Sequence, residues 1–328
     1  MIKVRPIAAV ATTVAVAALS LLGAVTATRA QDFPNKAITI VTGVGPGSNF
    51  DLLGRLFAER LRQKLGVPVV FENVTGGQGV IATQRVLGAK SDAYTLLIAG
   101  SGLGSTPLVM KNPGYKASDF IAVAPLGQVP FILYASNKMP ATDIPSLMAY
   151  LKTNAKDINS GYTTNSTVSL MLSRKFGKLS GGDWSDIGYR SSPEMILALL
   201  AGDLSLAAMP NAIGGQHAAA GKIRAIGVTG NQRTSVAPDL PTFKEMGYPT
   251  LIMNSWEGLF VKADMPADIL NKIKTASREI LADPSYLSAM APTGMEEWKI
   301  PFDTVQSAFD DEAKAFARDA EELKIKFD

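Results

Sequence analysis

The sequence contains no cysteine and a single histidine, His217, among its 328 residues. Without cysteine the chain can form neither a disulfide nor a cysteine nucleophile, so the hydrophobic core alone must stabilise the fold. One histidine, lying among alanines on a predicted helix, is too little for a zinc site, and no HExxH or G-x-S-x-G motif is present. These absences argue against metal sites and the common hydrolytic chemistries. We expect no metal, no cofactor and no catalytic residue.

The first thirty residues have the pattern of a secretory signal peptide. Lys3 and Arg5 precede an alanine-rich apolar run over residues 7–25, and Thr28 and Ala30 occupy positions −3 and −1 of a cleavage site. We therefore predict an exported protein that is cleaved after Ala30. The length of the run leaves open an uncleaved membrane anchor, whereas no later segment reaches the roughly 18 uninterrupted apolar residues of a spanning helix.

The charge balance does not indicate a nucleic acid partner. The chain has 32 basic and 29 acidic residues, and three of the basic ones, Lys3, Arg5 and Arg29, belong to the predicted leader, which leaves 29 of each sign. No block of like charges has the length of a nucleic-acid-binding arm. We expect no nucleic acid partner.

A glycine-rich turn between a predicted strand and a predicted helix is the most informative stretch. The strand covers residues 38–41, the turn residues 43–49 and the helix residues 50–65. Three glycines permit close approach to the backbone, and Ser48 and Asn49 are good N-cap residues. Because the first N–H groups of a helix have no partner within the helix, they form an anion site. We predict that this turn binds a carboxylate.

Two other interpretations of the turn stay open. It could be a tight connection without a ligand, or a dinucleotide site, because Glu72 ends the next predicted strand about 25 residues further on. The spacing of Gly43, Gly45 and Gly47 differs from G-x-G-x-x-G, however, and Pro46 interrupts it. Asp51 is expected to stabilise the helix start, because its negative charge would repel an acidic ligand.

Strand and helix patterns alternate along the chain, which is typical of an α/β fold with a parallel sheet. The apolar stretch 121–135 predicts a pair of buried strands that cross between domains, and residues 100–106 predict a loop. Further strands are predicted at 67–71, 95–99, 158–162, 184–189, 204–209 and 223–228, and further helices at 80–87, 144–153, 194–201, 211–220, 266–281 and 302–323. Ligands of such sheets bind beyond the carboxyl ends of the strands.

The domain prediction follows from these crossings. Residues 1–30 are the leader, residues 31–130 together with 255–328 form lobe 1, and residues 131–254 form lobe 2. Two crossings between two α/β lobes imply a cleft with a hinge.

Several motifs resemble those of the Bug-type extracytoplasmic receptors of tripartite tricarboxylate transporters. They are PNKAITIV (34–41), GPGSNFD (45–51), TGGQGVIA (75–82), SDAYTLL (91–97), APDLPTFKEMGYP (237–249) and SWEGLFV (255–261). The likeness covers nearly the whole chain after the leader, in the right order. It implies a type II periplasmic binding-protein fold in which two lobes, joined by two crossover strands, close on a small carboxylate in the periplasm.

The resemblance also implies the ligand contacts. In lobe 1 they fall on Gly45, Pro46, Gly47, Ser48, Asn49 and Ser101, and in lobe 2 on Thr163, Thr164, Asn165, Ser166 and Tyr189. Phe50 is bulky beside this pocket and could stack on a ligand. The sequence departs from the family pattern at Ser48, where a glycine is usual, at Ser169, where a histidine is common, and at Ser205, where an aspartate is usual. With Phe50, these changes suggest a less polar acid, either longer or aromatic.

We therefore predict a monomeric receptor, not an enzyme, that captures an organic acid, with a dicarboxylate favoured. Its partners would be that small carboxylate and the membrane permease subunits of a tripartite tricarboxylate-type transporter. Two alternatives stay open: a secreted α/β enzyme acting on a small acid, and a receptor that feeds a two-component sensor.

Overall fold

The computed structural model of the chain describes residues 33–163, 167–181 and 184–325. The described residues from Lys36 onward form a compact unit that contains all the helices and strands named below. The predicted signal peptide and its cleavage site lie outside the described residues. In the part of the chain that is described, no helix combines the length and the apolar character needed to cross a membrane.

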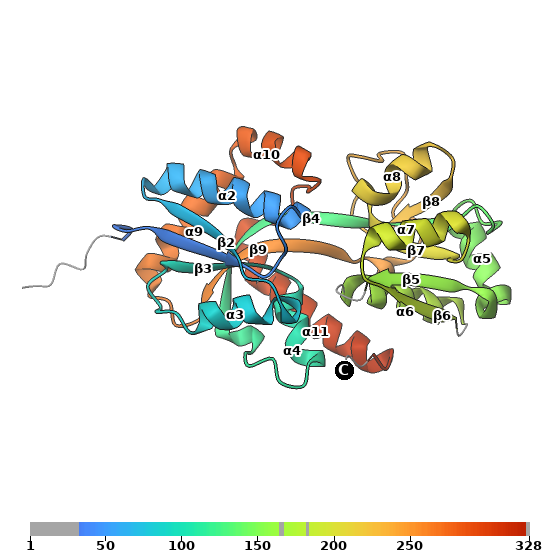
Figure 1. Cartoon of the computed structure of the whole chain (residues 1–328), viewed down its shortest axis with the longest axis horizontal. Helices are drawn as coiled ribbons and strands as arrows, with labels where there is room; N and C mark the ends of the chain where they lie inside the picture. The colour runs from blue at the N-terminus through green and yellow to red at the C-terminus, as the bar shows by residue number, and fades with distance from the viewer. Residues whose placement is uncertain (1–32, 164–166, 182–183, 326–328) are drawn as a thin grey trace, which may run out of the picture. The chain divides into compact units, whose positions relative to one another are not determined.

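The elements alternate between strand and helix (Figure 1). The strands are β1 (Ile38–Thr42), β2 (Val69–Asn73), β3 (Thr95–Gly100), β4 (Phe120–Ser136), β5 (Asn159–Thr163), β6 (Ser185–Tyr189), β7 (Leu206–Pro210), β8 (Ile223–Val228) and β9 (Asn254–Lys262). The α-helices are α2 (Asn49–Leu65), α3 (Val80–Leu87), α4 (Gly102–Val109), α5 (Ile144–Asn154), α6 (Thr167–Ser180), α7 (Ser192–Ala201), α8 (Asn211–Ala219), α9 (Ala267–Leu281), α10 (Pro284–Met290) and α11 (Val305–Glu322).

The strands form a sheet in the order β2-β1-β3-β9-β4-β7-β5-β6, with β8 also paired to β4. Strand β4 contributes to both halves of this sheet. Its residues 120–130 pair with β9, and its residues 131–136 pair with β7 and β8. We call the two parts the first and the second half-sheet. β1, β2 and β3 are mutually parallel in the first, and β5, β6 and β7 are mutually parallel in the second.

The stretch 121–135 is one long strand, and the predicted pair of strands was wrong. Pro125 and Pro130 suggested a break, because proline cannot donate a hydrogen bond to a sheet. The register shifts between Pro125 and Gly127, and Pro130 lies where β4 passes from β9 to β7. Proline is tolerated at such irregular positions, so β4 continues through both.

The predicted loop at residues 100–106 was also wrong, because helix α4 begins at Gly102. Glycine lowers helix propensity, which explains the prediction. A Cβ atom on Gly104 would lie 3.0 Å from the Phe309 ring and 3.1 Å from Ala313. The missing side chain thus lets α11 pack closely on α4, and this tertiary contact outweighs the local preference.

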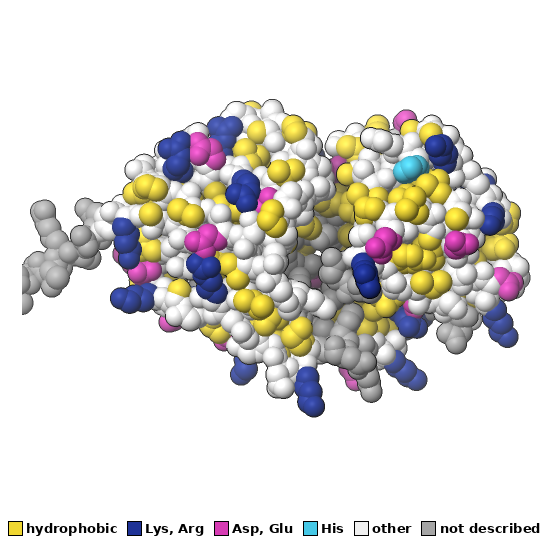
Figure 2. Space-filling model, in the orientation of Figure 1, with side chains coloured by type: hydrophobic (Ala, Val, Ile, Leu, Met, Phe, Trp, Pro, Cys, Tyr) yellow, Lys and Arg dark blue, Asp and Glu magenta, His cyan; other side chains and the backbone are white. Residues whose placement is uncertain are grey.

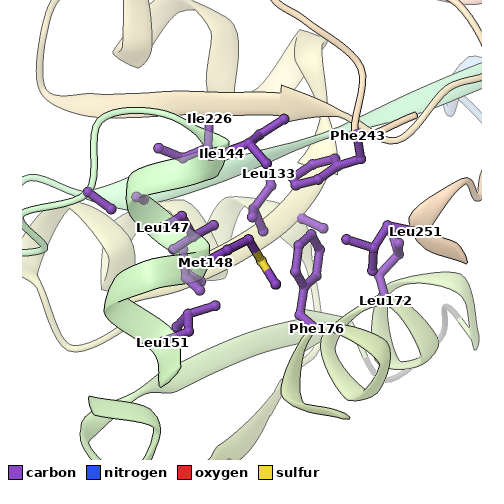
Figure 3. Close-up of a cluster of buried hydrophobic side chains, with 14 of the residues drawn as sticks. Leu133, Ile144, Leu147, Met148, Leu151, Leu172, Phe176, Ile226, Phe243 and Leu251 are labelled. Atoms are coloured by element: carbon purple, nitrogen blue, oxygen red, sulfur yellow. The ribbon is translucent and has the colours of Figure 1, made fainter. Parts of the chain in front are cut away.

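Helices cover both faces of each half-sheet. In the second half, α5 and α6 enclose a core that includes Leu133, Leu147 and Phe176 (Figure 3), while α7 and α8 cover the other face. In the first half, α3, α4 and α11 lie on one side and α2 and α10 on the other (Figure 1). The C-terminal helices α9 and α11 contact β4, and α10 contacts α2. Helix α11 also reaches α6, where Lys175 forms a 2.5 Å ion pair with Asp319.

Candidate functional site

The carboxyl ends of parallel strands from both half-sheets face the place where β4 passes from one half-sheet to the other. In the first half, β3 ends at Gly100, which pairs with Glu257 near the start of β9, and β1 runs parallel to β3. In the second half, β7 ends at Pro210, which pairs with Phe131 just after the passage, and β5 and β6 run parallel to β7. The carboxyl ends of β1, β3, β5, β6 and β7 therefore converge. The surface is hollowed between the two halves (Figure 2).

The predicted residues of the first lobe lie at this edge. The turn after β1 contains Gly45, Pro46 and Gly47, which are exposed, while residues 48–50 are half-buried. Ser101 directly follows β3. Since β1 and β3 are adjacent parallel strands, the structure brings the turn and Ser101 to the same edge.

Ser48 is the N-cap residue of α2, as predicted. Its hydroxyl accepts the Asp51 N–H at 3.2 Å and donates to the Gly45 carbonyl at 2.9 Å. In the described part of the chain, the N–H groups of Asn49 and Phe50 have no hydrogen-bond partner. These two N–H groups at the helix start can bind an anion.

Asp51 holds the turn in place from inside the protein. Its carboxylate accepts the Gly47 N–H at 2.8 Å, the Asn73 amide at 2.7 Å and the Arg55 guanidinium at 3.1 Å. Asn73 also donates to the Val44 carbonyl at 3.0 Å, which ties the turn to the end of β2. Burial would raise the pKa of Asp51, but these hydrogen bonds together lower it. The carboxylate is therefore ionised and fully engaged within the protein.

Sequence reasoning singled out Glu72 and missed its neighbour Asn73. The position of Asn73 at the end of a strand could have indicated its role, because it is the last residue of β2 and lies opposite Thr42, the last residue of β1. Glu72 instead forms an ion pair with Arg85 on α3. The turn after β1 also contacts the glycine-rich stretch 76–79 that precedes α3, because a Cβ on Gly43 would lie 2.5 Å from the Gly79 backbone.

In the second half-sheet, Thr163 and Tyr189 lie opposite each other at the ends of β5 and β6. The Thr163 hydroxyl is buried and lies 3.3 Å from the Ser169 hydroxyl, so it already has a partner within the protein. Tyr189 is half-buried, and burial together with the charge of Asp203 raises the pKa of its hydroxyl. The predicted contacts Thr164, Asn165 and Ser166 lie outside the described residues. Whether these residues contact a ligand stays a prediction.

The chain matches the family model described as "Tripartite tricarboxylate transporter family receptor" over residues 53–320. It belongs to this receptor family. The chain is 32% identical over 290 residues to a UPF0065 protein of Bordetella bronchiseptica, and the match covers 87% of this chain and 85% of that protein. The members of this receptor family are periplasmic solute-binding proteins that bind small carboxylates and work with transporter permeases.

Two solved structures share the fold. The periplasmic binding protein BugD is 26% identical, with a TM-score of 0.71, over 90% of this chain and 99% of that one. R. palustris Rpa4515, solved with adipate, is 25% identical, with a TM-score of 0.74, over 90% and 99%. The predicted type II periplasmic binding-protein fold, with two lobes and a cleft, is confirmed, and so is the resemblance from which it followed.

Proposed function

We propose that this tricarboxylate-type receptor binds an organic dicarboxylate and delivers it to the permease subunits of a tripartite transporter. The observation that carries the proposal is the pair of free N–H groups at Asn49 and Phe50, at the start of α2 and directly after the turn that Asp51 holds in place. A helix start with free N–H groups attracts a carboxylate through hydrogen bonds and the helix dipole. The relative Rpa4515, crystallised with adipate, agrees with a ligand that carries two carboxylates.

The two ends of the ligand would meet different lobes. One carboxylate lies at the turn formed by Gly45, Pro46, Gly47, Ser48 and Asn49, beside Ser101. The distal group meets the second lobe at Thr163, Thr164, Asn165, Ser166 and Tyr189. Phe50 is half-buried next to the free N–H groups, where its ring can pack on the carbon chain or an aromatic ring of the ligand. Contacts to both lobes would favour the closed state.

The remaining assignments rest on the same proposal. The protein would be exported to the periplasm, cleaved after Ala30, and act there as a monomer without catalysis. Lobe 1 would comprise residues 31–130 and 255–328, and lobe 2 residues 131–254.

The test is a thermal-shift screen of residues 31–328 after unfolding and refolding to remove carried-over ligand. Succinate, adipate, citrate and terephthalate are the probes, and adipamide, the neutral diamide of adipate, is the matched control. A ligand that binds only the native state at 100 times its dissociation constant adds about 2.7 kcal/mol, which corresponds to a shift of several degrees. A shift with an acid and none with adipamide supports the proposal. No shift with any acid contradicts it.

A further inference from the structure

Helix α11 connects the two lobes through the side chains on its inner face. Phe309 packs in the core of the first half-sheet, whereas Phe316 and Ala320 pack with Met171 of α6. Glu312 lies three residues after Phe309 and four before Phe316, so it shares their face of the helix. An acidic side chain therefore occupies the inner face of α11 between its contacts with the two lobes.

Glu312 contacts the first lobe through Trp256. The indole N–H of Trp256 donates to the Glu312 carboxyl group. Trp256 is 2% exposed, and its ring stacks on Trp298 with 4.5 Å between centroids and meets Phe309 edge-on at 6.2 Å. An aromatic cluster thus fixes the position of the donor, and through it the position of the Glu312 side chain.

The same pair lies next to the Ser101 turn. A Cβ on Gly100 would lie 2.5 Å from the carbonyl oxygen of Trp256, so the residue before Ser101 rests on the Trp256 backbone. One turn into α4, Gly104 packs on the neighbouring α11 side chains Phe309 and Ala313. A shift of Trp256 caused by a change at Glu312 would therefore reach Ser101, a predicted ligand contact.

Several charged groups on the elements packed around Glu312 already have partners. On α6, Lys175 pairs with Asp319 and Lys178 with Glu322, and on α11 itself Lys314 pairs with Asp311. Helix α4 carries no titratable residue, and Glu297 and Lys299 flank Trp298. Glu257, next to Trp256 on β9, points to the opposite face of the sheet, because successive strand residues alternate. Burial raises the pKa of Glu312 to about 7, against the lowering effect of the Trp256 hydrogen bond.

We propose that Glu312 is a positioning residue that couples ligand binding to the uptake of a proton. The inference rests on the proposed function, because it assumes an anionic ligand beside Ser101. In the protonated carboxyl group one oxygen still accepts the Trp256 N–H, whereas the ionised group places a negative charge on Trp256, whose backbone contacts the residue before Ser101. The bound state therefore favours the protonated form, and the proton comes from the solvent. Binding is tighter at pH 6 than at pH 8.

The experiment is calorimetric titration of refolded residues 31–328 with succinate, adipate, citrate and terephthalate at pH 6, 7 and 8. Glu312→Gln keeps an oxygen for Trp256 but cannot titrate. The natural protein should bind three- to tenfold more weakly at pH 8 than at pH 6, within the limit of tenfold per pH unit for one proton. The variant should show no such change, and Glu321→Gln, on the exposed side of the same helix, should behave like the natural protein.

A second measurement needs no variant. Repeating the natural protein's titration at pH 7 in buffers of different ionisation enthalpy reports the number of protons taken up, which should lie between zero and one. Equal pH dependence in the natural protein and Glu312→Gln, no proton uptake, or a profile abolished by Glu257→Gln alone would each overturn the role of Glu312 and leave the receptor function standing. Absence of binding by any acid at any pH would overturn both.

Discussion

Replacing Asp51 with asparagine tests whether its carboxylate holds the ligand turn. The carboxylate accepts three hydrogen bonds, from Gly47, Asn73 and Arg55. An asparagine keeps one oxygen and places an NH2 group at the other position, where it meets a donor in either orientation. A flip of the Asn73 side-chain amide would not compensate without cost. Its NH2 group already donates to the Val44 carbonyl, and its oxygen already accepts from Arg55.

The expected loss of stability in Asp51→Asn follows from those hydrogen bonds. Leaving one buried donor unsatisfied costs about 1–3 kcal/mol, and hydrogen bonds to a charged acceptor are roughly twice as strong as neutral ones. The Asp51 side chain is 2% exposed, so little water reaches the carboxylate itself. The ion pair with the half-exposed Arg55 adds at most about 1 kcal/mol. We expect Asp51→Asn to lower the free energy of unfolding by about 2–4 kcal/mol at pH 7.

The pH dependence has a definite sign. The pKa of Asp51 is lower in the folded protein than in the unfolded chain. Its contribution is therefore fully present above the unfolded value of about 3.9 and is lost as the pH falls through the folded value. The difference between natural protein and variant should persist at pH 7 and shrink below about pH 4.

The assay is urea unfolding followed by circular dichroism. The matched control is Glu59→Gln on the same helix, because Glu59 also binds an arginine, Arg62, but its side chain is 49% exposed. This control should change stability by less than about 0.5 kcal/mol. A loss for Asp51→Asn no larger than that of Glu59→Gln would refute the reasoning.

Three further predictions concern single side chains. Gly43→Ala should destabilise the protein by about 1–3 kcal/mol, because its Cβ would meet the Gly79 backbone at 2.5 Å; Gly45→Ala, where nothing lies within 4 Å of a Cβ, is the control, and equal melting temperatures would contradict the close contact. Glu257 is buried, and burial followed by the charge of Asp51 raises its pKa well above the usual value. The natural protein should therefore lose stability as the pH rises from about 4 towards that pKa, whereas Glu257→Gln should show a flatter profile in urea unfolding at pH 5 to 9; parallel profiles would exclude this titration. Phe50→Ala should weaken the binding of aromatic acids more than that of aliphatic acids in calorimetry, and equal losses would remove the proposed stacking.

Much of the fold could be read from local patterns. The apolar run 38–41 and the helix after Ser48 were predicted to within one residue, because a buried strand and an N-capped helix depend on nearby side chains. The family motifs, spread over nearly the whole chain, were enough to identify the receptor fold. The candidate anion site also followed from the chain alone, since free N–H groups at a helix start are a local property.

Other features depended on residues far apart in the sequence. Helix α4 forms despite two glycines because α11, about 200 residues later, packs on Gly104. The partners of Asp51 on α2 include Asn73 at the end of β2, and the donor to Glu312 is Trp256 on β9. Hydrogen bonds and burial set the pKa of a carboxyl group, and both arise only when distant segments meet. The sequence thus determined the kind of protein and its elements, whereas the tertiary structure decided which acids hold the turn and which can titrate.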